Sequence, residues 1–193
     1  EGIDKLIKGS YGRGHGSVGD QIHFNFEGRN VTRLTTLQLT GPEYGEHEQQ
    51  SFRRATAAKG FYIPHAIRES RYLEDVKEIL WDAFLLYGKM LENKDIPKED
   101  SRFPLSLSAK TNITTAKNVR ELHHLHGMNG QGEVPSCVKN DVNRMVEEAS
   151  KVSPLLMRKM TSNYEMLAWR PSTQIYASTN ETLNRIVEKN NKP

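Results

Sequence analysis

The chain has 193 residues, enough to bury the core of one folded domain. Its 36% hydrophobic and 26% charged residues are typical of a soluble globular protein, and a net charge of +3 is too weak to predict nucleic-acid binding. We find no bilayer-length apolar run and no signal-peptide pattern, and one cysteine cannot form an intrachain disulfide, so we expect a cytoplasmic protein without a membrane partner.

The first half of the chain predicts a helix and a strand, followed by less regular sequence. Apolar residues recur at helical spacing in residues 1–8, and residues 21–27 alternate as a half-buried strand does. Residues 31–39 are ambiguous, because their leucines fit a helical face whereas their threonines favour a strand. The glycines and proline of residues 40–50 predict a loop.

The second half is richer in helix signals. Residues 73–93 form the clearest amphipathic helix, and residues 138–149 form another. Residues 105–115 suit a strand or extended segment, and residues 117–126 suit a helix that the following glycines break. Mixed elements without βαβ alternation predict an α+β fold. We expect a single domain over residues 1–193, with a frayed polar tail at 184–193.

A glycine-rich turn precedes the first predicted strand. His15, Ser17 and Asp20 place three polar groups in it, and its glycines let backbone amides approach a ligand closely. This combination suits a nucleotide or a flavin. The glycines match G-x-G-x-x-G, but a dinucleotide fingerprint needs a strand before them and a helix after them. The predicted order is the reverse, which excludes that site and leaves an ordinary turn as the alternative.

Several polar groups suggest other chemistry. A metal site at the histidines near Glu121 is disfavoured, because only His123 and His126 share a helix face and no H-E-x-x-H or C-x-x-C motif is present. Cys137, flanked by apolar residues, is predicted to be buried and structural. Arg120 lies in register with leucines, where it either needs an anionic partner or is an ordinary surface arginine.

Ser51 lacks the G-x-S-x-G context of a serine nucleophile. With Arg53 and Arg54 beside it, it suits a phosphate better, and the alternative is a solvated polar segment. RNA binding through these arginines and Lys59 is disfavoured, because interleaved aromatic residues and strong positive charge are missing.

Taken in order, the blocks GHGSVGDQIHFNFEG, LTTLQL, EQQSFRR and LSLSAKTNITTAKNVRELHHL resemble the flavin-dependent thymidylate synthases over about residues 1–160. The resemblance implies a mixed sheet flanked by helices, here without the family's first strand and helix. It also implies a homotetramer that binds FAD and a uridine nucleotide at subunit interfaces. NADPH and methylenetetrahydrofolate are the implied co-substrates, and no cysteine attacks the pyrimidine.

The resemblance also assigns site residues by position. The cofactor-binding positions are occupied by His15, Ser17, Asp20, Asn118 and Arg120. The nucleotide-binding positions are occupied by Gln38, Ser51, Phe52, Arg53, Arg102 and Asn129. Among these, Ser51 and Arg53 surround the phosphate, and Arg102 comes from a neighbouring subunit. No catalytic residue and no metal ligand is assigned.

The chain departs from the family signature RHRxxSxNExSxRY. Ser51 and Arg53 persist, but the leading Arg-His-Arg is replaced by Gly-Pro-Glu at residues 41–43 and the first serine by Glu46. Asn129 replaces an arginine that contacts the pyrimidine. The phosphate end is therefore kept and the base end rebuilt. Two hypotheses follow: C5-methylation of a uridine nucleotide that is not necessarily dUMP, or a catalytically inactive nucleotide-binding or structural subunit.

Overall fold

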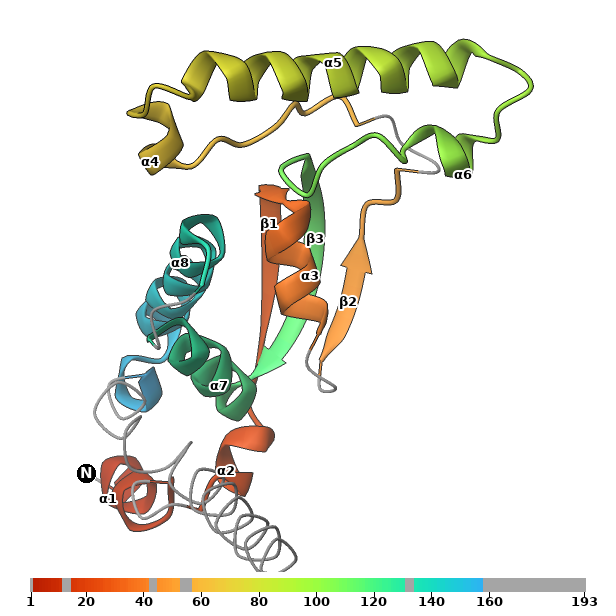
Figure 1. The fold of residues 1–193 in the computed structure, drawn as a ribbon. Coiled ribbons are helices and arrows are strands. Elements are labelled where there is room, and N and C mark those ends of the chain that lie inside the picture. Colours follow the sequence, from red (N-terminus) through yellow and green to blue (C-terminus); the bar gives the residue numbers. More distant parts are fainter. Residues whose placement is uncertain (1, 12–14, 42–44, 53–56, 131–133, 158–193) are drawn as a thin grey trace, which may run out of the picture.

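The computed structural model describes residues 2–11, 15–41, 45–52, 57–130 and 134–157, apart from the side chain of residue 130. Their elements follow one another along the chain (Figure 1), in the order α1 (Gly2–Gly9), α2 (Ser17–Asp20), β1 (His23–Thr32), α3 (Arg33–Thr40), β2 (Glu46–Gln49), α4 (His65–Arg68), α5 (Leu73–Glu92), α6 (Lys98–Ser101), β3 (Lys110–Asn118), α7 (Val119–Gly130) and α8 (Ser136–Val152). Arg53 and the tail at 184–193 lie outside the described residues.

The sheet has the order β1-β3-β2, and β3 is antiparallel to both neighbours. His23 of β1 lies opposite Asn118, and Glu46 of β2 lies opposite Ala116. The α+β class is confirmed, but the described strands form an antiparallel sheet rather than the expected mixed one. Strands β1 and β2 run in the same direction, but each pairs only with β3, which lies between them. No parallel pair therefore forms among the described strands.

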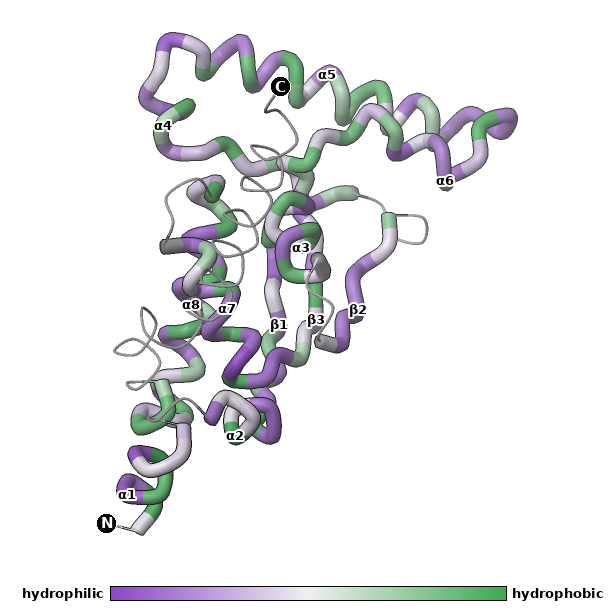
Figure 2. The backbone as a smooth tube through the Cα atoms, turned by 60° about the horizontal axis from the view of Figure 1, so that its bottom comes forward, coloured by the Kyte–Doolittle hydropathy of each residue, from purple (hydrophilic) through white to green (hydrophobic). Residues whose placement is uncertain are grey.

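Helices cover one face of this sheet and build the main core. Residues of α3, β3, α7 and α8 form a buried cluster that includes Leu39, Ile113, Leu122, Val138 and Val142. Figure 2 shows apolar segments of α7 and α8 beside the sheet. A second cluster of Phe52, Ala57, Tyr87 and Ala109 joins the long helix α5 to the end of the sheet. The core thus fixes both ends of β3, where the predicted site residues lie.

The helices at 73–93 and 138–149 are confirmed by α5 and α8, and the ambiguous segment 31–39 is the end of β1 followed by α3. Thr32 caps α3, its Oγ1 accepting a hydrogen bond from the Thr35 amide at 2.9 Å. Two expectations are wrong in part. The predicted loop at 40–50 contains β2, a polar strand held at the sheet edge by backbone pairing with β3. Gly127 does not break α7, because it is buried in a helix that packs against α8.

The predicted strand at 105–115 is confirmed only in part, since β3 begins at Lys110 and continues to Asn118. Its inward side chains are Thr111, Ile113, Thr115 and Lys117, all buried. The helix expected at 117–126 therefore begins two residues later, at Val119. None of the helices in the described ranges combines the length and the apolar character that crossing a bilayer requires.

Candidate functional site

Four of the residues assigned to cofactor binding meet where α2 lies against the start of α7. We call Ser17, Asp20, Asn118 and Arg120 the Arg120 corner. Arg120 Nη1 donates to Asp20 Oδ2 at 3.1 Å, although a hundred residues separate the two in sequence. The Arg120 side chain is 65% exposed. One of its five N–H donors is used in this contact, so the others can reach a ligand.

Glycines allow α2 and α7 to pack closely at this corner. A Cβ atom on Gly16 would lie 3.4 Å from Arg120 Nε, and one on Gly19 would lie 2.9 Å from the Tyr11 ring. Gly19 also lies against the backbone of Arg120. The glycines singled out in the sequence therefore bring α2 against α7, which is a packing role beside any role toward a ligand.

Asn118 has a structural role at the end of β3. Its Oδ1 accepts a hydrogen bond from the Glu121 amide at 2.7 Å, which satisfies one of the free donors in the first turn of α7. His15 is exposed in the turn before α2, and its carbonyl accepts from the Val18 amide at 3.2 Å. Asn118 thus positions the helix that carries Arg120, while His15 remains accessible.

The nucleotide-binding assignments lie mainly at the opposite end of β3. Phe52 is only 7% exposed, and the guanidinium of Arg33 lies over its ring, 5.6 Å from the centroid. Burial lowers the pKa of Arg33, and the nearby charge of Arg102 lowers it further. We call Arg33, Ser51, Phe52 and Arg102 the Phe52 corner. Arg33 was missed from the sequence, because only the fold brings it to Phe52.

Gln38 and Asn129 lie away from that corner. Gln38 is half-buried on α3. Asn129 is buried near the end of α7, and its Nδ2 donates to the Lys139 carbonyl of α8 at 3.5 Å. Asn129 therefore helps to join two helices.

A buried ion pair links α3 to α7. Lys117 is fully buried, and its Nζ donates to the Leu39 carbonyl at 2.9 Å and pairs with the Glu121 carboxylate. Burial raises the pKa of Glu121, while the hydrogen bond from Lys117 opposes this rise. Sequence reasoning missed Lys117, although its inward register in β3 and a glutamate four residues later were signals.

The altered signature window packs on this pair through Gly45. Gly45 has φ +129°, a conformation that favours glycine. A Cβ there would lie 2.9 Å from Lys117 Nζ and 3.2 Å from Glu121 Oε2. His47, in β2, hydrogen-bonds Thr115 at 2.8 Å, and burial together with the Lys117 charge lowers its pKa. Glu46 is exposed at the start of β2.

The remaining candidates take structural positions. His123 is buried against Tyr11 with its ring edge-on, whereas His124 is exposed. Within the part of the chain that the structure describes, no three potential ligands gather as a metal site. Cys137 is buried, as predicted, and accepts a weak hydrogen bond from Thr32 at 3.7 Å.

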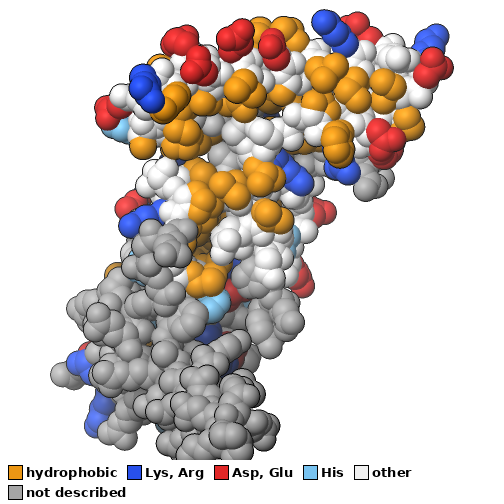
Figure 3. All heavy atoms as spheres, in the orientation of Figure 1, with side chains coloured by type: hydrophobic (Ala, Val, Ile, Leu, Met, Phe, Trp, Pro, Cys, Tyr) orange, Lys and Arg blue, Asp and Glu red, His pale blue; other side chains and the backbone are white. Residues whose placement is uncertain are grey.

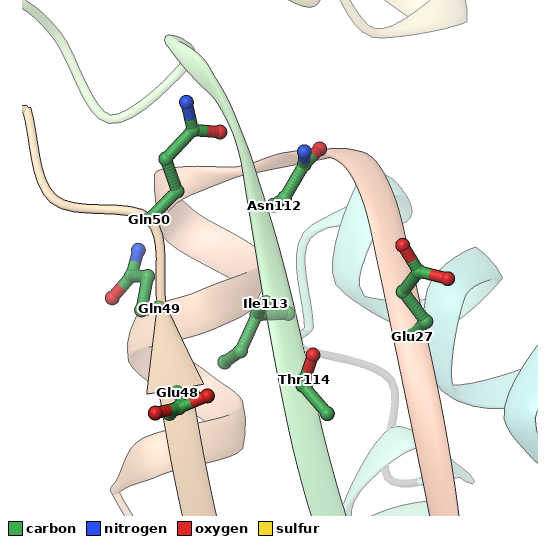
Figure 4. A pocket seen from close by; sticks show the side chains of 7 residues that line it. All are labelled: Glu27, Glu48, Gln49, Gln50, Asn112, Ile113 and Thr114. Carbon is green, nitrogen blue, oxygen red and sulfur yellow. The ribbon is translucent and has the colours of Figure 1, made fainter. Parts of the chain in front are cut away.

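Two surface hollows lie elsewhere. One of about 330 Å³ lies at β2 and β3, where Figure 4 shows the side chains of Glu27, Glu48, Gln49, Gln50, Asn112, Ile113 and Thr114. A larger one of about 700 Å³ lies between β1 and α8, with Asp141 and Arg144 in its wall. Neither wall includes a described residue that was assigned to the cofactor or the nucleotide.

Comparison with known proteins finds relatives along most of the chain. The flavin-dependent thymidylate synthase of Pyrococcus furiosus is 28% identical over 155 residues, covering 77% of this chain and 63% of the relative. That of Pyrococcus horikoshii is 32% identical over 144 residues, covering 72% and 59%. The chain thus spans about three fifths of the length of these curated relatives.

A solved structure has the same fold. The UMP/dUMP methylase PolB from Streptomyces cacaoi, bound with 5-Br UMP, superimposes with a TM-score of 0.69 at 18% identity, covering 83% of this chain and 81% of that one. The family model described as thymidylate synthase complementing protein matches residues 1–155. Since that match takes in every described helix and strand, the chain belongs to the Thy1 family, the thymidylate synthase complementing proteins.

Proposed function

We propose that this protein catalyses the flavin-dependent C5-methylation of a uridine nucleotide. The observation that carries the proposal is the Arg120 corner. Asp20 of α2 pairs with Arg120 of α7 although a hundred residues separate them, and the guanidinium stays exposed, with Ser17 on the same short helix as Asp20 and Asn118 just before α7. The curated relatives are named flavin-dependent thymidylate synthases, which supports the same activity here.

The residues of this corner fit a flavin nucleotide such as FAD. Arg120 offers charge-assisted donors to an anionic cofactor, and Ser17 and His15 offer accessible polar groups on the adjoining turn. Reduced FAD, once bound, supplies the electrons that convert a methylene group from methylenetetrahydrofolate to a methyl group on C5 of uracil, and NADPH is the proposed source of those electrons. The role of the protein residues is to bind and orient the cofactor and the pyrimidine.

The nucleotide is proposed to bind through its phosphate at the Phe52 corner. Ser51 and Arg53 retain the S-x-R step of the family signature, and Arg102 adds a second guanidinium. Gln38 is proposed to contact the nucleoside. A serine hydroxyl with planar arginine donors suits a phosphate better than a neutral ligand.

Association of several copies is part of the proposal. The Arg120 corner lies at one end of β3 and the Phe52 corner at the other, so residues of neighbouring subunits would complete each site in a homotetramer. Exposed apolar side chains support association, because such patches mark interaction surfaces. Figure 3 shows apolar groups gathered along α5, where the exposed ones include Ile79, Trp81, Leu85 and Leu86, and Phe103, which follows α6, is exposed as well.

We propose that dUMP is a poor substrate. Asn129 replaces a base-contacting arginine and is held between two helices, and Glu46 adds a carboxylate to the signature window. A carboxylate near the pyrimidine would disfavour its anionic form. PolB is described as a UMP/dUMP methylase, which supports testing the ribonucleotide first.

The test is product analysis with reduced FAD, methylenetetrahydrofolate and a panel of uridine nucleotides. We expect a C5-methylated product from UMP or a modified uridine nucleotide, and little from dUMP. Release of FAD from the denatured protein checks cofactor binding independently. Conversion of dUMP at the rate of an ordinary family member would contradict the proposed specificity.

The alternative is an inactive nucleotide-binding or structural subunit, which the altered signature favours. The two functions separate cleanly in experiment. An inactive subunit would bind UMP by calorimetry but form no methylated product with any nucleotide of the panel, alone or with FAD added. Turnover that appears only after mixing with an active paralogue would assign it a supporting role.

A further inference from the structure

The backbone of Arg33 is fixed at the junction of β1 and α3. Its amide donates to the Ala109 carbonyl at 2.9 Å, and the preceding Thr32 caps the helix. Ala109 belongs to the same buried cluster as Phe52. The side chain of Arg33 therefore leaves a rigid point and reaches the Phe52 ring over a short, defined path.

Phe52 offers a rigid surface for the guanidinium. Its ring is buried with Ala57 and Tyr87, and the Tyr87 hydroxyl accepts a hydrogen bond from the Ala57 amide at 3.1 Å. A guanidinium over an aromatic face is attracted by the ring and keeps its in-plane N–H donors available. Ser51, assigned to the phosphate, directly precedes this ring.

Arg102, which the resemblance assigned from a neighbouring subunit, brings a second positive charge near Arg33 within the same chain, close enough to lower the pKa of Arg33. It follows α6, and its Nε donates to the Glu99 carbonyl at 3.1 Å. Within the described residues, no carboxylate forms an ion pair with Arg33 or Arg102. Arg29 and Arg120, by contrast, are paired with Glu27 and Asp20. The electrostatic repulsion between two half-buried arginines falls when an anion binds between them.

We propose that Arg33 is a further phosphate-binding residue of the nucleotide site and acts together with Arg102 of the same chain. This assignment rests on the proposed function, in which Ser51 and Arg102 hold the phosphate. It explains how the chain retains enough positive charge for an anionic ligand after the loss of the signature Arg-His-Arg. Arg33 supplies one of the missing guanidinium groups from a different element of the fold.

The test is calorimetric titration of the purified full chain with UMP, uridine and inorganic phosphate. We expect Arg33→Gln to weaken UMP binding at least tenfold, leave uridine binding unchanged and abolish competition by inorganic phosphate. Arg33→Lys, which keeps the charge but not the planar fork, should give an intermediate loss. Arg29→Gln is the matched control, because Arg29 is exposed and paired with Glu27; it should bind UMP as the wild type does.

The outcomes separate this assignment from the function on which it rests. Wild-type protein that prefers UMP to uridine, together with an Arg33→Gln variant of unchanged UMP affinity, would overturn the role of Arg33 alone. Wild-type protein that binds UMP no better than uridine would overturn the nucleotide function and this assignment with it. If Arg33→Gln melts at a lower temperature, Arg33→Lys and Arg102→Gln are tested in its place. The proposal requires each of these two variants to reduce the preference for UMP over uridine, and an unchanged preference in both would overturn it.

Discussion

Arg120 and Arg33 each stand in the first turn of a helix, but the charges around them differ. Arg120 is exposed and already paired with Asp20, whereas Arg33 is half-buried over an aromatic ring beside a second arginine. The charge of a paired arginine is already partly neutralised by its carboxylate, so a second anion gains less from binding to it. An arginine that faces another cation gains from any anion that arrives. We therefore expect the Phe52 corner to discriminate by charge more strongly than the Arg120 corner.

The largest effect is expected from replacing Lys117, the buried residue that contacts the helices of both corners. Lys117 contacts α3, which begins at Arg33, and pairs with Glu121 in the first turn of α7, beside Arg120. Lys117→Met leaves a buried carboxylate without its cation, and we expect the free energy of unfolding to fall by about 3–5 kcal/mol. Urea denaturation measures it.

The control is the double variant Lys117→Met, Glu121→Gln, which removes both charges. We expect it to recover most of the lost stability, because an apolar or neutral pair avoids the cost of an isolated buried charge. A double variant as unstable as Lys117→Met would show that packing, rather than charge, makes Lys117 important.

Acid should destabilise the protein through His123, whose ring partner Tyr11 packs against Gly19 of α2. Burial lowers the pKa of His123, which packs on Tyr11 beneath Gly19, to about 3. The unfolded chain takes up this proton near pH 6.5 while the folded chain does not, so stability falls as the pH drops from about 6.5 toward 3, by at most about 1.4 kcal/mol per pH unit. The raised pKa of Glu121 acts in the opposite direction.

The measurement is the free energy of unfolding at pH 7 and pH 5 for wild type and His123→Leu. We expect a smaller loss between these conditions in the variant, by about 2 kcal/mol at most. The exposed His65 provides the control substitution, His65→Gln. Equal acid sensitivity of wild type and His123→Leu would exclude His123 as the source.

Removing Arg120 tests the cofactor side of the comparison. Arg120→Ala should weaken FAD binding about tenfold, because it deletes a charge-assisted contact worth about 1.5 kcal/mol or more. Flavin fluorescence titration gives the dissociation constant, and a thermal melt checks that the variant is folded. A folded variant with unchanged affinity would remove Arg120 from the cofactor site.

The smallest effect is expected from Asp20→Asn. This change frees Arg120 from its carboxylate partner, so FAD affinity should rise slightly or stay within about threefold of the wild type. The same titration measures it. A loss as large as that of Arg120→Ala would mean that Asp20 itself holds the cofactor or the conformation of the turn.

Sequence patterns predicted the elements whose signals are local. The 3.6-residue periodicity of α5 and α8 is contained in each segment, and so is the alternation of β1. Strand β2 is entirely polar and exists because β3 pairs with it, so no local pattern indicated it. The ambiguity at 31–39 was settled by the Thr32 cap and by packing of α3 on the sheet.

The candidate site divides in the same way. The resemblance assigned Asp20 and Arg120 to cofactor binding, and the fold brings these two side chains into contact, while their role toward a cofactor stays a prediction. Arg33 and Lys117 gain their importance from partners far away in sequence, Phe52 and the Leu39 carbonyl. Such long-range pairs depend on the fold, which a single sequence does not reveal.

The close fit of Gly45 against the Lys117–Glu121 pair has a consequence for protein engineering. A side chain at position 45 would meet both the ammonium and the carboxylate, and φ +129° disfavours any residue but glycine. Grafting the family's Arg-His-Arg onto residues 41–43 and its serine onto residue 46 should therefore leave Gly45 in place, which the signature allows because it leaves that position open. Even a methyl group at this position, as in Gly45→Ala, would press on the buried ion pair and lower stability, whatever residues surround it in the rebuilt window.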